Sequence, residues 1–139
     1  FIYLRTSLLQ KDIFMAEYKV LLVDNNTIRR KLLAGYLTQL QCLYSEAKNG
    51  KQAIEMIAND SFDLVLMDIQ LPVIDGIEAT KIIRKKLPFP KNRVKIIANT
   101  TTNYKDFFNQ FYDVGFNDVL PTPSTLDSLK TIIEYHIRD

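Results

Sequence analysis

Cysteine and histidine are almost absent from this chain of 139 residues, which holds one of each, Cys42 and His136. A single cysteine excludes a disulfide within the chain and is typical of a protein that works in a reducing cytoplasm. One cysteine and one histidine are also too few for a zinc site built from these residue types. We therefore interpret His136 as a packing or surface residue rather than as a ligand or phosphoryl donor.

An excess of charge is missing as well. The 18 basic and 16 acidic residues leave a formal net charge of +2, which gives no general attraction to nucleic acid or to a membrane. Basic residues gather between positions 84 and 95, but three of them end an expected helix, where cations complement the helix dipole. We interpret this cluster as a solvated face, and it comprises Arg84, Lys85, Lys86, Lys91, Arg93 and Lys95.

The sequence also lacks a segment that reads as a leader or a membrane span. Residues 1–14 are apolar in patches, but charged residues interrupt them and no small-residue cleavage site follows. We expect residues 1–17 to be an N-terminal extension (a tag, an upstream remnant or a linker) and residues 18–139 to form one domain. The composition, 47% hydrophobic and 24% charged, is ordinary for such a domain.

From residue 19 onward, apolar runs alternate with helical patterns, which predicts a parallel sheet. Strands are expected at 19–24, 42–47, 64–68, 94–99 and 118–120. Helices are expected from Asn26 or Thr27 to about residue 40, at 52–59, at 76–86, from Asn103 to before Gly115, and at 126–137. These five β/α units indicate a single-domain, doubly wound α/β fold of the flavodoxin-like type with strand order 2-1-3-4-5. Pro121 agrees with this order, because it requires the fifth strand to lie at an edge.

Two helices carry patterns that test this fold. In the first helix the inward stripe is predicted to be Ile28, Leu32, Leu33, Tyr36, Leu37 and Leu40. The helix that follows Asn103 carries Tyr104, Phe107, Phe108, Phe111 and Tyr112. This aromatic set is wider than a core-facing helix needs, so we expect some of its rings to be exposed.

The stretch that organises the chain is 63–76, DLVLMDIQLPVIDG. Its continuous apolar run is typical of a strand buried on both faces of a parallel sheet, and the run ends abruptly at Asp68. Open α/β sheets bind ligands at the carboxyl ends of their strands. Asp24 ends the first strand, which neighbours the third in this topology, so we expect the two carboxylates to lie close together. Two acids there favour a hard divalent cation such as Mg²⁺.

Within this stretch, Asp68 is followed four residues later by Pro72 and eight residues later by Gly76. This segment closely resembles the phosphoacceptor segment of response-regulator receiver domains, especially those of hybrid histidine kinases. The resemblance extends from about Tyr18 to the carboxyl terminus. It implies that a phosphohistidine on a histidine kinase or phosphotransfer protein donates a phosphoryl group to the domain. Enzymatic activity would then be limited to Mg²⁺-dependent self-phosphorylation and dephosphorylation.

Carried over position by position, the resemblance implies roles for several residues. Asp68 is the phosphoacceptor, Asp24 is the first member of the acidic pair, and the backbone carbonyl of Gln70 completes the metal shell. Thr100 matches the switch hydroxyl that hydrogen-bonds the phosphoryl group. The family also implies a cis peptide bond between Thr122 and Pro123, and a surface made by the helix after Asn103, strand 118–120 and the last helix that meets a second copy or an output partner.

Three positions depart from the family. Asn25 stands where most receivers have a second metal-binding acid, so Mg²⁺ is expected to bind weakly. Thr122 stands where most receivers have a lysine that pairs with the phosphoryl group. Val119 replaces the aromatic usual in the fifth strand. Two hypotheses therefore stay open: a phosphorelay receiver, and a pseudo-receiver that acts as a protein-interaction module without phosphorylation.

Other enzyme classes fit poorly. The sequence contains no GxxxxGK[ST] loop. Aspartyl phosphatases with a paired D-x-D motif would need an acid where Gln70 stands. A flavin mononucleotide site would need a phosphate-binding loop after the first strand, where Asp24 instead favours a cation.

Overall fold

The computed structural model describes residues 16–137. The strands are β1 (Lys19–Val23), β2 (Leu43–Ala47), β3 (Leu64–Asp68), β4 (Lys95–Thr100) and β5 (Asp118–Pro121). The helices that alternate with them are α2 (Thr27–Gln39), α3 (Gly50–Asn59), α4 (Gly76–Lys86), α5 (Tyr104–Phe111) and α6 (Leu126–Ile137), and the short 3-10 helix η1 (Lys91–Arg93) precedes β4. The predicted alternation is therefore confirmed.

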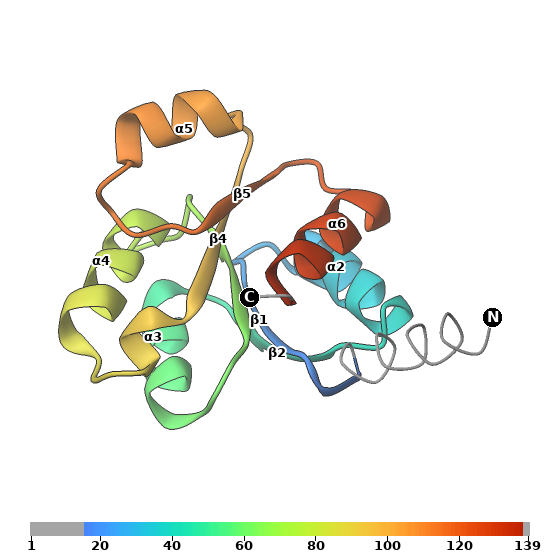
Figure 1. Ribbon diagram of the computed structural model, residues 1–139, viewed down its shortest axis with the longest axis horizontal. Coiled ribbons are helices and arrows are strands. Elements are labelled where there is room, and N and C mark those ends of the chain that lie inside the picture. The colour runs from blue at the N-terminus through green and yellow to red at the C-terminus, as the bar shows by residue number, and fades with distance from the viewer. Residues whose placement is uncertain (1–15, 138–139) are drawn as a thin grey trace.

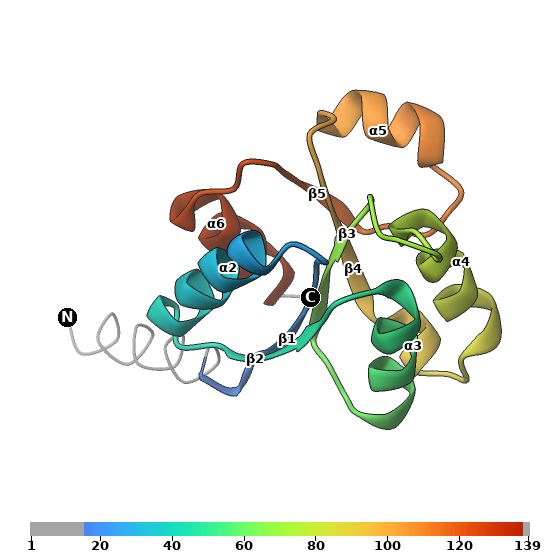
Figure 2. The same cartoon turned by 180° about the vertical axis from the view of Figure 1, so that it is seen from behind.

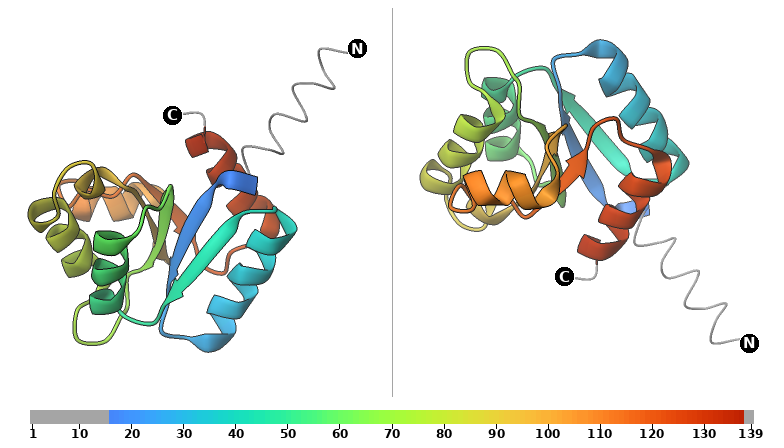
Figure 3. Two further views of the ribbon diagram at one scale, coloured as in Figure 1. Left: turned by 90° about the horizontal axis from the view of Figure 1, so that it is seen from below. Right: turned by 90° about the horizontal axis from the view of Figure 1, so that it is seen from above.

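The strands form one parallel sheet in the order β2-β1-β3-β4-β5, as predicted. Helices α2 and α6 cover one face of this sheet, and α3, α4 and α5 cover the other (Figure 1, and from behind in Figure 2). Strand β5 lies at an edge, so Pro121 at its end is tolerated. The views along the vertical direction show the strands running between these two helical layers (Figure 3).

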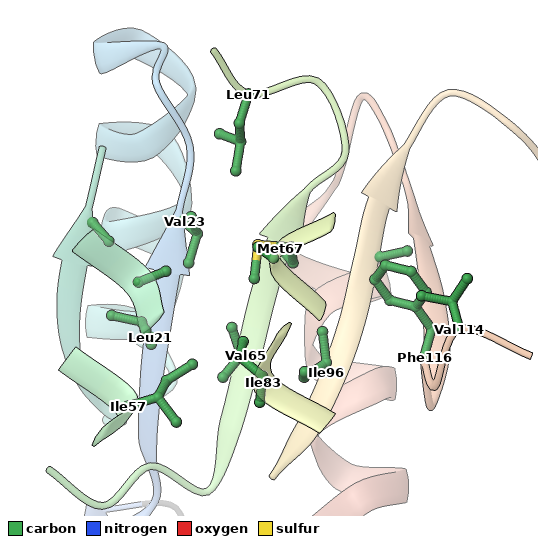
Figure 4. Packing of buried hydrophobic residues seen from close by; sticks show 14 of the residues in the cluster. Leu21, Val23, Ile57, Val65, Met67, Leu71, Ile83, Ile96, Val114 and Phe116 are labelled. Carbon is green, nitrogen blue, oxygen red and sulfur yellow. The ribbon is translucent and has the colours of Figure 1, made fainter. Parts of the chain in front are cut away.

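The central strand β3 is buried along its whole length because both of its faces meet a helical layer. Val65 and Met67 point into the core cluster beneath α3 and α4, which Figure 4 shows. Leu64 and Leu66 point the other way, into the cluster beneath α2 and α6. This alternation explains the uninterrupted apolar run of the sequence, and it fixes Asp68 at the point where the strand leaves the core.

The face that α2 turns to the sheet differs from the prediction. Ile28 is 80% exposed and Leu32 is 49% exposed. Arg30, Leu33, Ala34 and Leu37 are the buried residues of the helix. Arg30 can point inward because its Nη1 donates to the backbone oxygen of Asp24 at 2.8 Å and its Nε donates to Glu46 Oε1 at 2.9 Å. The predicted inward stripe was therefore wrong at Ile28 and Leu32. The pattern of apolar residues in the sequence could not show this, because the residue that points inward in their place is an arginine.

Part of the basic cluster has a structural role. Arg84 donates to the backbone oxygens of Gly115, Asn92 and Val94 at distances between 2.6 and 2.9 Å. Lys91 likewise donates from Nζ to the backbone oxygen of Ile57, in the last turn of α3, and to that of Asp60, which follows the helix. These bonds hold α4 and η1 against the segments around them, so the interpretation of the cluster as a solvated face was wrong for Arg84 and Lys91.

A glycine fixes the loop between β3 and α4. A Cβ atom on Gly76 would lie 2.2 Å from the backbone oxygen of Asp68 and 2.9 Å from the Cα of Ile69. The Gly76 amide also donates to the backbone oxygen of Ile69 at 3.0 Å. Any side chain at this position would therefore push the start of α4 away from the end of β3.

We predict opposite effects for two glycine-to-alanine substitutions. Gly76→Ala should lower the free energy of unfolding by about 2–3 kcal/mol, because the new methyl group meets backbone atoms that cannot turn aside. Gly35→Ala, in the exposed part of α2 with no atom within 4 Å of the added Cβ, should raise it by about 0.5–1 kcal/mol. Urea unfolding of both variants measures this difference. Equal effects of the two substitutions would contradict the close approach at Gly76.

Candidate functional site

Two acids lie at the carboxyl edge of the sheet, as predicted. Asp24 directly follows β1, Asp68 ends β3, and these strands pair in register through Val23 and Met67. Both side chains are buried. The amide of Asn26 donates to Asp24 Oδ1 at 2.8 Å, and the amide of Gln70 donates to Asp68 Oδ1 at 3.1 Å. Each carboxylate is thus held by the backbone of the loop that follows its strand.

Asp68 opens into a cleft of about 130 Å³ between the loops that follow β3, β4 and β5. The expected site residues Gln70, Thr100 and Thr122 line the same cleft. The complete lining consists of Arg29, Asp68, Ile69, Gln70, Asn99, Thr100, Thr101 and Thr122. The topology therefore brings together residues that are far apart in the sequence.

The environment of Asp68 disfavours its charge. Burial is the largest cause, and it raises the pKa of Asp68 to about 6. The nearby charge of Asp24 acts in the same direction, whereas the hydrogen bond from the Gln70 amide and the charge of Arg29 lower the pKa. A carboxyl with such a pKa is still mostly ionised at neutral pH.

Arg29 is a charged residue of the site that was not predicted from the sequence. Its Nε donates to Asp24 Oδ2 at 3.0 Å, its Nη2 donates to Asp24 Oδ1 at 3.2 Å, and the same Nη2 lies 3.5 Å from Asp68 Oδ2. The guanidinium thus bridges the two acids. A signal was present: Arg29 lies in the first turn of α2, which contains no acidic residue, where a cation opposes the helix dipole.

Two threonines of the cleft use their hydroxyls locally. Thr100 Oγ1 accepts a hydrogen bond from the amide of Thr102 at 3.2 Å. Thr122 Oγ1 donates to Asn99 Oδ1 at 2.7 Å, and Asn99 is a buried residue that the sequence analysis did not single out. The peptide bond between Thr122 and Pro123 is cis, as predicted.

The oxygen donors at this edge have the chemistry that Mg²⁺ prefers. The carboxylates of Asp24 and Asp68 are hard ligands, and the backbone carbonyl of Gln70 is the expected third. Asn25 is exposed and brings no charge. Among residues 16–137 no group of three His, Cys, Asp or Glu side chains could hold a metal ion. The oxygen donors match the chemistry of Mg²⁺. Only two carboxylates contribute charge, however, and Arg29 already contacts both.

Three other expectations concern residues away from the cleft. His136 is buried and its Nε2 lies 2.9 Å from Asp118 Oδ2, so it packs against β5 as interpreted. Val119 is buried in the core, and Cys42 is buried and free.

No helix within residues 16–137 is both long and apolar enough to cross a membrane. Most of the expected extension, 1–15, lies outside the described residues, so the boundary at residue 17 stays a prediction.

Five parallel strands in this order, with helices on both faces and acids at the carboxyl edge, define a flavodoxin-like α/β domain. The chain belongs to the family of response regulator receiver domains, since the model of that family matches residues 20–134. It is thus a receiver domain of the two-component phosphorelay type. This confirms the resemblance and the fold that the sequence analysis identified.

Similar curated proteins are much longer than this chain. The transcription factor SKN7 of Chaetomium thermophilum is 36% identical over 121 residues, which is 86% of this chain and 15% of that protein. Hybrid signal transduction histidine kinase A of Dictyostelium discoideum is 36% identical over 114 residues, which is 81% of this chain and 5% of that protein. The chain spans less than a fifth of either relative, so it corresponds to one part of such proteins.

Solved structures show the same fold. The receiver domain of sensor histidine kinase PA1611 from Pseudomonas aeruginosa, which has a magnesium ion coordinated in its active site cleft, matches with a TM-score of 0.79 and 29% identity over 88% of this chain and 99% of that one. The Ssk1 receiver domain of Saccharomyces cerevisiae, in complex with the phosphotransfer protein Ypd1, gives a TM-score of 0.74 and 32% identity over 86% and 89%.

The raised pKa of Asp68 predicts a pH-dependent cost in stability. The folded domain binds a proton at Asp68 more tightly than the unfolded chain does, so this residue lowers stability as pH rises from about 4 to about 6. Without metal, Asp68→Asn should therefore raise the free energy of unfolding by about 1–2 kcal/mol at pH 7.5 and by less than about 0.5 kcal/mol at pH 4.5.

Urea unfolding in the presence of a metal chelator measures both differences. Asp113→Asn serves as the control, because Asp113 is an exposed carboxyl outside the cleft, and it should change stability little at either pH. A stabilisation by Asp68→Asn that is the same at both pH values, or a loss of stability, would contradict this environment of Asp68.

Proposed function

We propose that this receiver domain accepts a phosphoryl group on Asp68 from a phosphohistidine of a histidine kinase or phosphotransfer protein, with Mg²⁺ as cofactor. The observation that carries the proposal is the position of Asp68. It is a buried carboxylate at the end of the central strand, and it opens into a cleft lined by hydroxyl and amide groups. Among the described residues, Asp24 is the only other acid at this edge that is buried, and Arg29 covers both of its oxygens.

The transfer step needs the carboxylate form of Asp68. An Oδ oxygen of Asp68 forms a bond to phosphorus while the bond between phosphorus and the donor's imidazole nitrogen breaks, and that nitrogen keeps the electron pair. With a pKa of about 6, Asp68 is largely ionised at neutral pH. The hydroxyls of Thr100 and Thr122 lie in the same cleft, where they can turn to donate to phosphoryl oxygens.

We infer that Mg²⁺ is held by Asp24 and Asp68, with the Gln70 carbonyl and the Asn25 amide as further ligands. Bound there, the ion would offset the negative charge of the phosphoryl oxygens. Its affinity should be low, because Asn25 contributes no charge and Arg29 competes for the carboxylates. The magnesium ion in the cleft of the PA1611 receiver supports this assignment by similarity.

The pseudo-receiver remains the second candidate, and one observation favours it. Thr122 offers no cation to a phosphoryl group, and its hydroxyl is already bonded to Asn99 at 2.7 Å. A domain of this kind would present the same surfaces without being phosphorylated. For either function we propose a cytoplasmic location, which the free, buried Cys42 supports.

The exposed apolar residues beside the cleft form a partner surface in this proposal. Ile28 and Leu32 lie on the outer side of α2, which begins next to Asp24, and Val73 is fully exposed in the loop that follows Asp68. Val73 also has a positive φ of 66°, which is strained for a β-branched residue. A phosphohistidine donor must approach this edge, and apolar side chains here would pack against it. The Ypd1–Ssk1 complex supports a phosphotransfer protein as such a partner.

The surface of α5, β5 and α6 stays a prediction as the site for a second copy or an output partner. Tyr104 is 59% exposed and Tyr112 is 77% exposed, whereas Phe107 is buried. The expectation that part of the aromatic set is exposed is therefore confirmed. Tyr104 of α5 and Tyr135 of α6 also line one pocket together with Asp118 of β5. Their exposure leaves this surface available for the proposed contact.

We predict that Asp68 is the phosphorylated residue. Wild-type protein with Mg²⁺ and acetyl phosphate should gain the mass of one phosphoryl group, and Asp68→Asn should gain none, because no other acid combines burial with an open cleft. Asp75→Asn changes the carboxyl that caps α4 and serves as the control that should still be labelled. No mass gain in the wild type at any Mg²⁺ concentration would favour the pseudo-receiver, and labelling of Asp68→Asn would overturn the assignment.

We also predict that Ile28→Glu separates donor binding from chemistry. Phosphoryl transfer from a phosphorylated histidine phosphotransfer protein should slow by about tenfold, the effect of losing one apolar contact at an interface, whereas labelling by acetyl phosphate should be unchanged. Leu43→Glu is the matched control, because Leu43 is 55% exposed and lies at the amino end of β2, whereas the cleft lies at the carboxyl ends of the strands. Equal slowing by both variants would contradict a partner surface on α2.

A further inference from the structure

Arg29 is the one cation that lines the cleft of Asp68 among the residues the structure describes. Its guanidinium makes two contacts with Asp24, at 3.0 and 3.2 Å, and a longer one with Asp68, at 3.5 Å. These contacts place a permanent positive charge where the oxygen donors of a divalent ion would converge. Arginine keeps this charge at any physiological pH.

The helix that carries Arg29 gives no electrostatic support to this position. Asn26 caps α2 by accepting a hydrogen bond from the Arg29 amide at 2.9 Å, so Arg29 lies in the first turn. The helix dipole is positive at this end, and the turn contains no acid to offset it. Side chains of a helix lean toward its N-terminus, which carries the guanidinium over the ends of β1 and β3. The carboxylates are therefore what holds Arg29 in place.

The cleft lacks two charged side chains that the family resemblance leads us to expect. The position that resembles the phosphoryl-pairing lysine of the family holds Thr122, and the position of the second acid holds Asn25. Both substitutions remove charge from the site. Arg29 adds a cation within reach of the same phosphoacceptor oxygen, from a different element of the fold.

We propose that Arg29 supplies the positive charge that Thr122 does not. In the resting domain its guanidinium neutralises Asp24 and Asp68, and it competes there with Mg²⁺. When a phosphoryl group is on Asp68, the guanidinium pairs with a phosphoryl oxygen. The second half of this inference rests on the proposed phosphorylation of Asp68, whereas the competition with Mg²⁺ does not.

The side chain has the freedom and the donors that both tasks need. Arg29 is 44% exposed, so its guanidinium can pivot out of the cleft, whereas Asp24 is almost fully buried and stays fixed. The guanidinium has five N–H donors in a planar fork, which suits a carboxylate and a phosphoryl group equally. The longer contact with Asp68 leaves that carboxylate the more accessible of the two.

The first test is Mg²⁺ affinity, measured by calorimetry on the unphosphorylated chain. Arg29→Gln should bind Mg²⁺ roughly five- to tenfold more tightly than wild type, because a competing, partly exposed ion pair is removed. Lys31→Gln is the control, since Lys31 is an exposed cation of the same helix turn outside the cleft. The Mg²⁺ affinity of this variant should stay within about twofold of wild type. Unchanged affinity in Arg29→Gln, or an equal gain in both variants, would overturn the inference.

The second test uses beryllofluoride, a phosphoryl mimic, at saturating Mg²⁺. Arg29→Gln should bind it roughly tenfold more weakly than wild type or Lys31→Gln, the loss expected for one charge-assisted contact. Arg29→Lys, which keeps the charge, should lie nearer to wild type. Equal beryllofluoride affinity in wild type and Arg29→Gln would overturn the phosphoryl role. Beryllofluoride binding to none of the proteins would contradict the proposed function instead, and the Mg²⁺ titration would still decide whether Arg29 competes for the carboxylates.

Discussion

The burial of two neighbouring carboxylates at one edge of the sheet is the constraint on which this site depends. Asp24 and Asp68 follow neighbouring strands of the sheet core, so the fold itself forces them to one edge and removes most of their water. The loss of water is the larger effect and the charge of Asp24 acts in the same direction, so the pKa of Asp68 rises to about 6. A cation, the backbone amides of the following loops, or a proton must offset this cost. In this structure the guanidinium of Arg29 and the backbone amides of Asn26 and Gln70 contact the two carboxylates and offset part of this cost.

The packing of the rest of the domain prevents Asp24 and Asp68 from moving apart. Strand β3 is held on both faces by packed helices, so Asp68 cannot withdraw from the edge without disrupting two core clusters. Gly76 brings the start of α4 against the backbone of Asp68, at a distance that excludes any side chain. The loop between them therefore has little room to move. The carboxylates are therefore held by buried strands, whereas the Arg29 side chain above them is 44% exposed.

The sequence predicted the parts of this arrangement that follow from local pattern. The apolar run before Asp68, the cap at Asn103 and the edge position of Pro121 each have one physical reading, and each was confirmed. Of the two candidate caps for the first helix, Asn26 and Thr27, the structure uses Asn26. The strand order followed from the alternation of elements. With that order, Asp24 had to lie near Asp68.

The parts that were missed depend on how a helix is rotated about its axis. Ile28 and Arg30 differ by two positions, so the pattern alone favours the apolar residue as the inward one. The structure reverses them because Arg30 finds the backbone oxygen of Asp24 and the carboxylate of Glu46. The same rotation brings Arg29 over the cleft. A long side chain satisfied by tertiary partners cannot be recognised from the residues beside it in the chain.

The charge of Asp68 in solution tests this account most directly. The carboxyl carbon of Asp68 can be followed by nuclear magnetic resonance as pH is varied, first with a chelator and then with Mg²⁺. We expect a midpoint near the pKa of about 6 without metal and a lower midpoint when Mg²⁺ is present. A midpoint near the ordinary value of about 4 that Mg²⁺ does not move would contradict it.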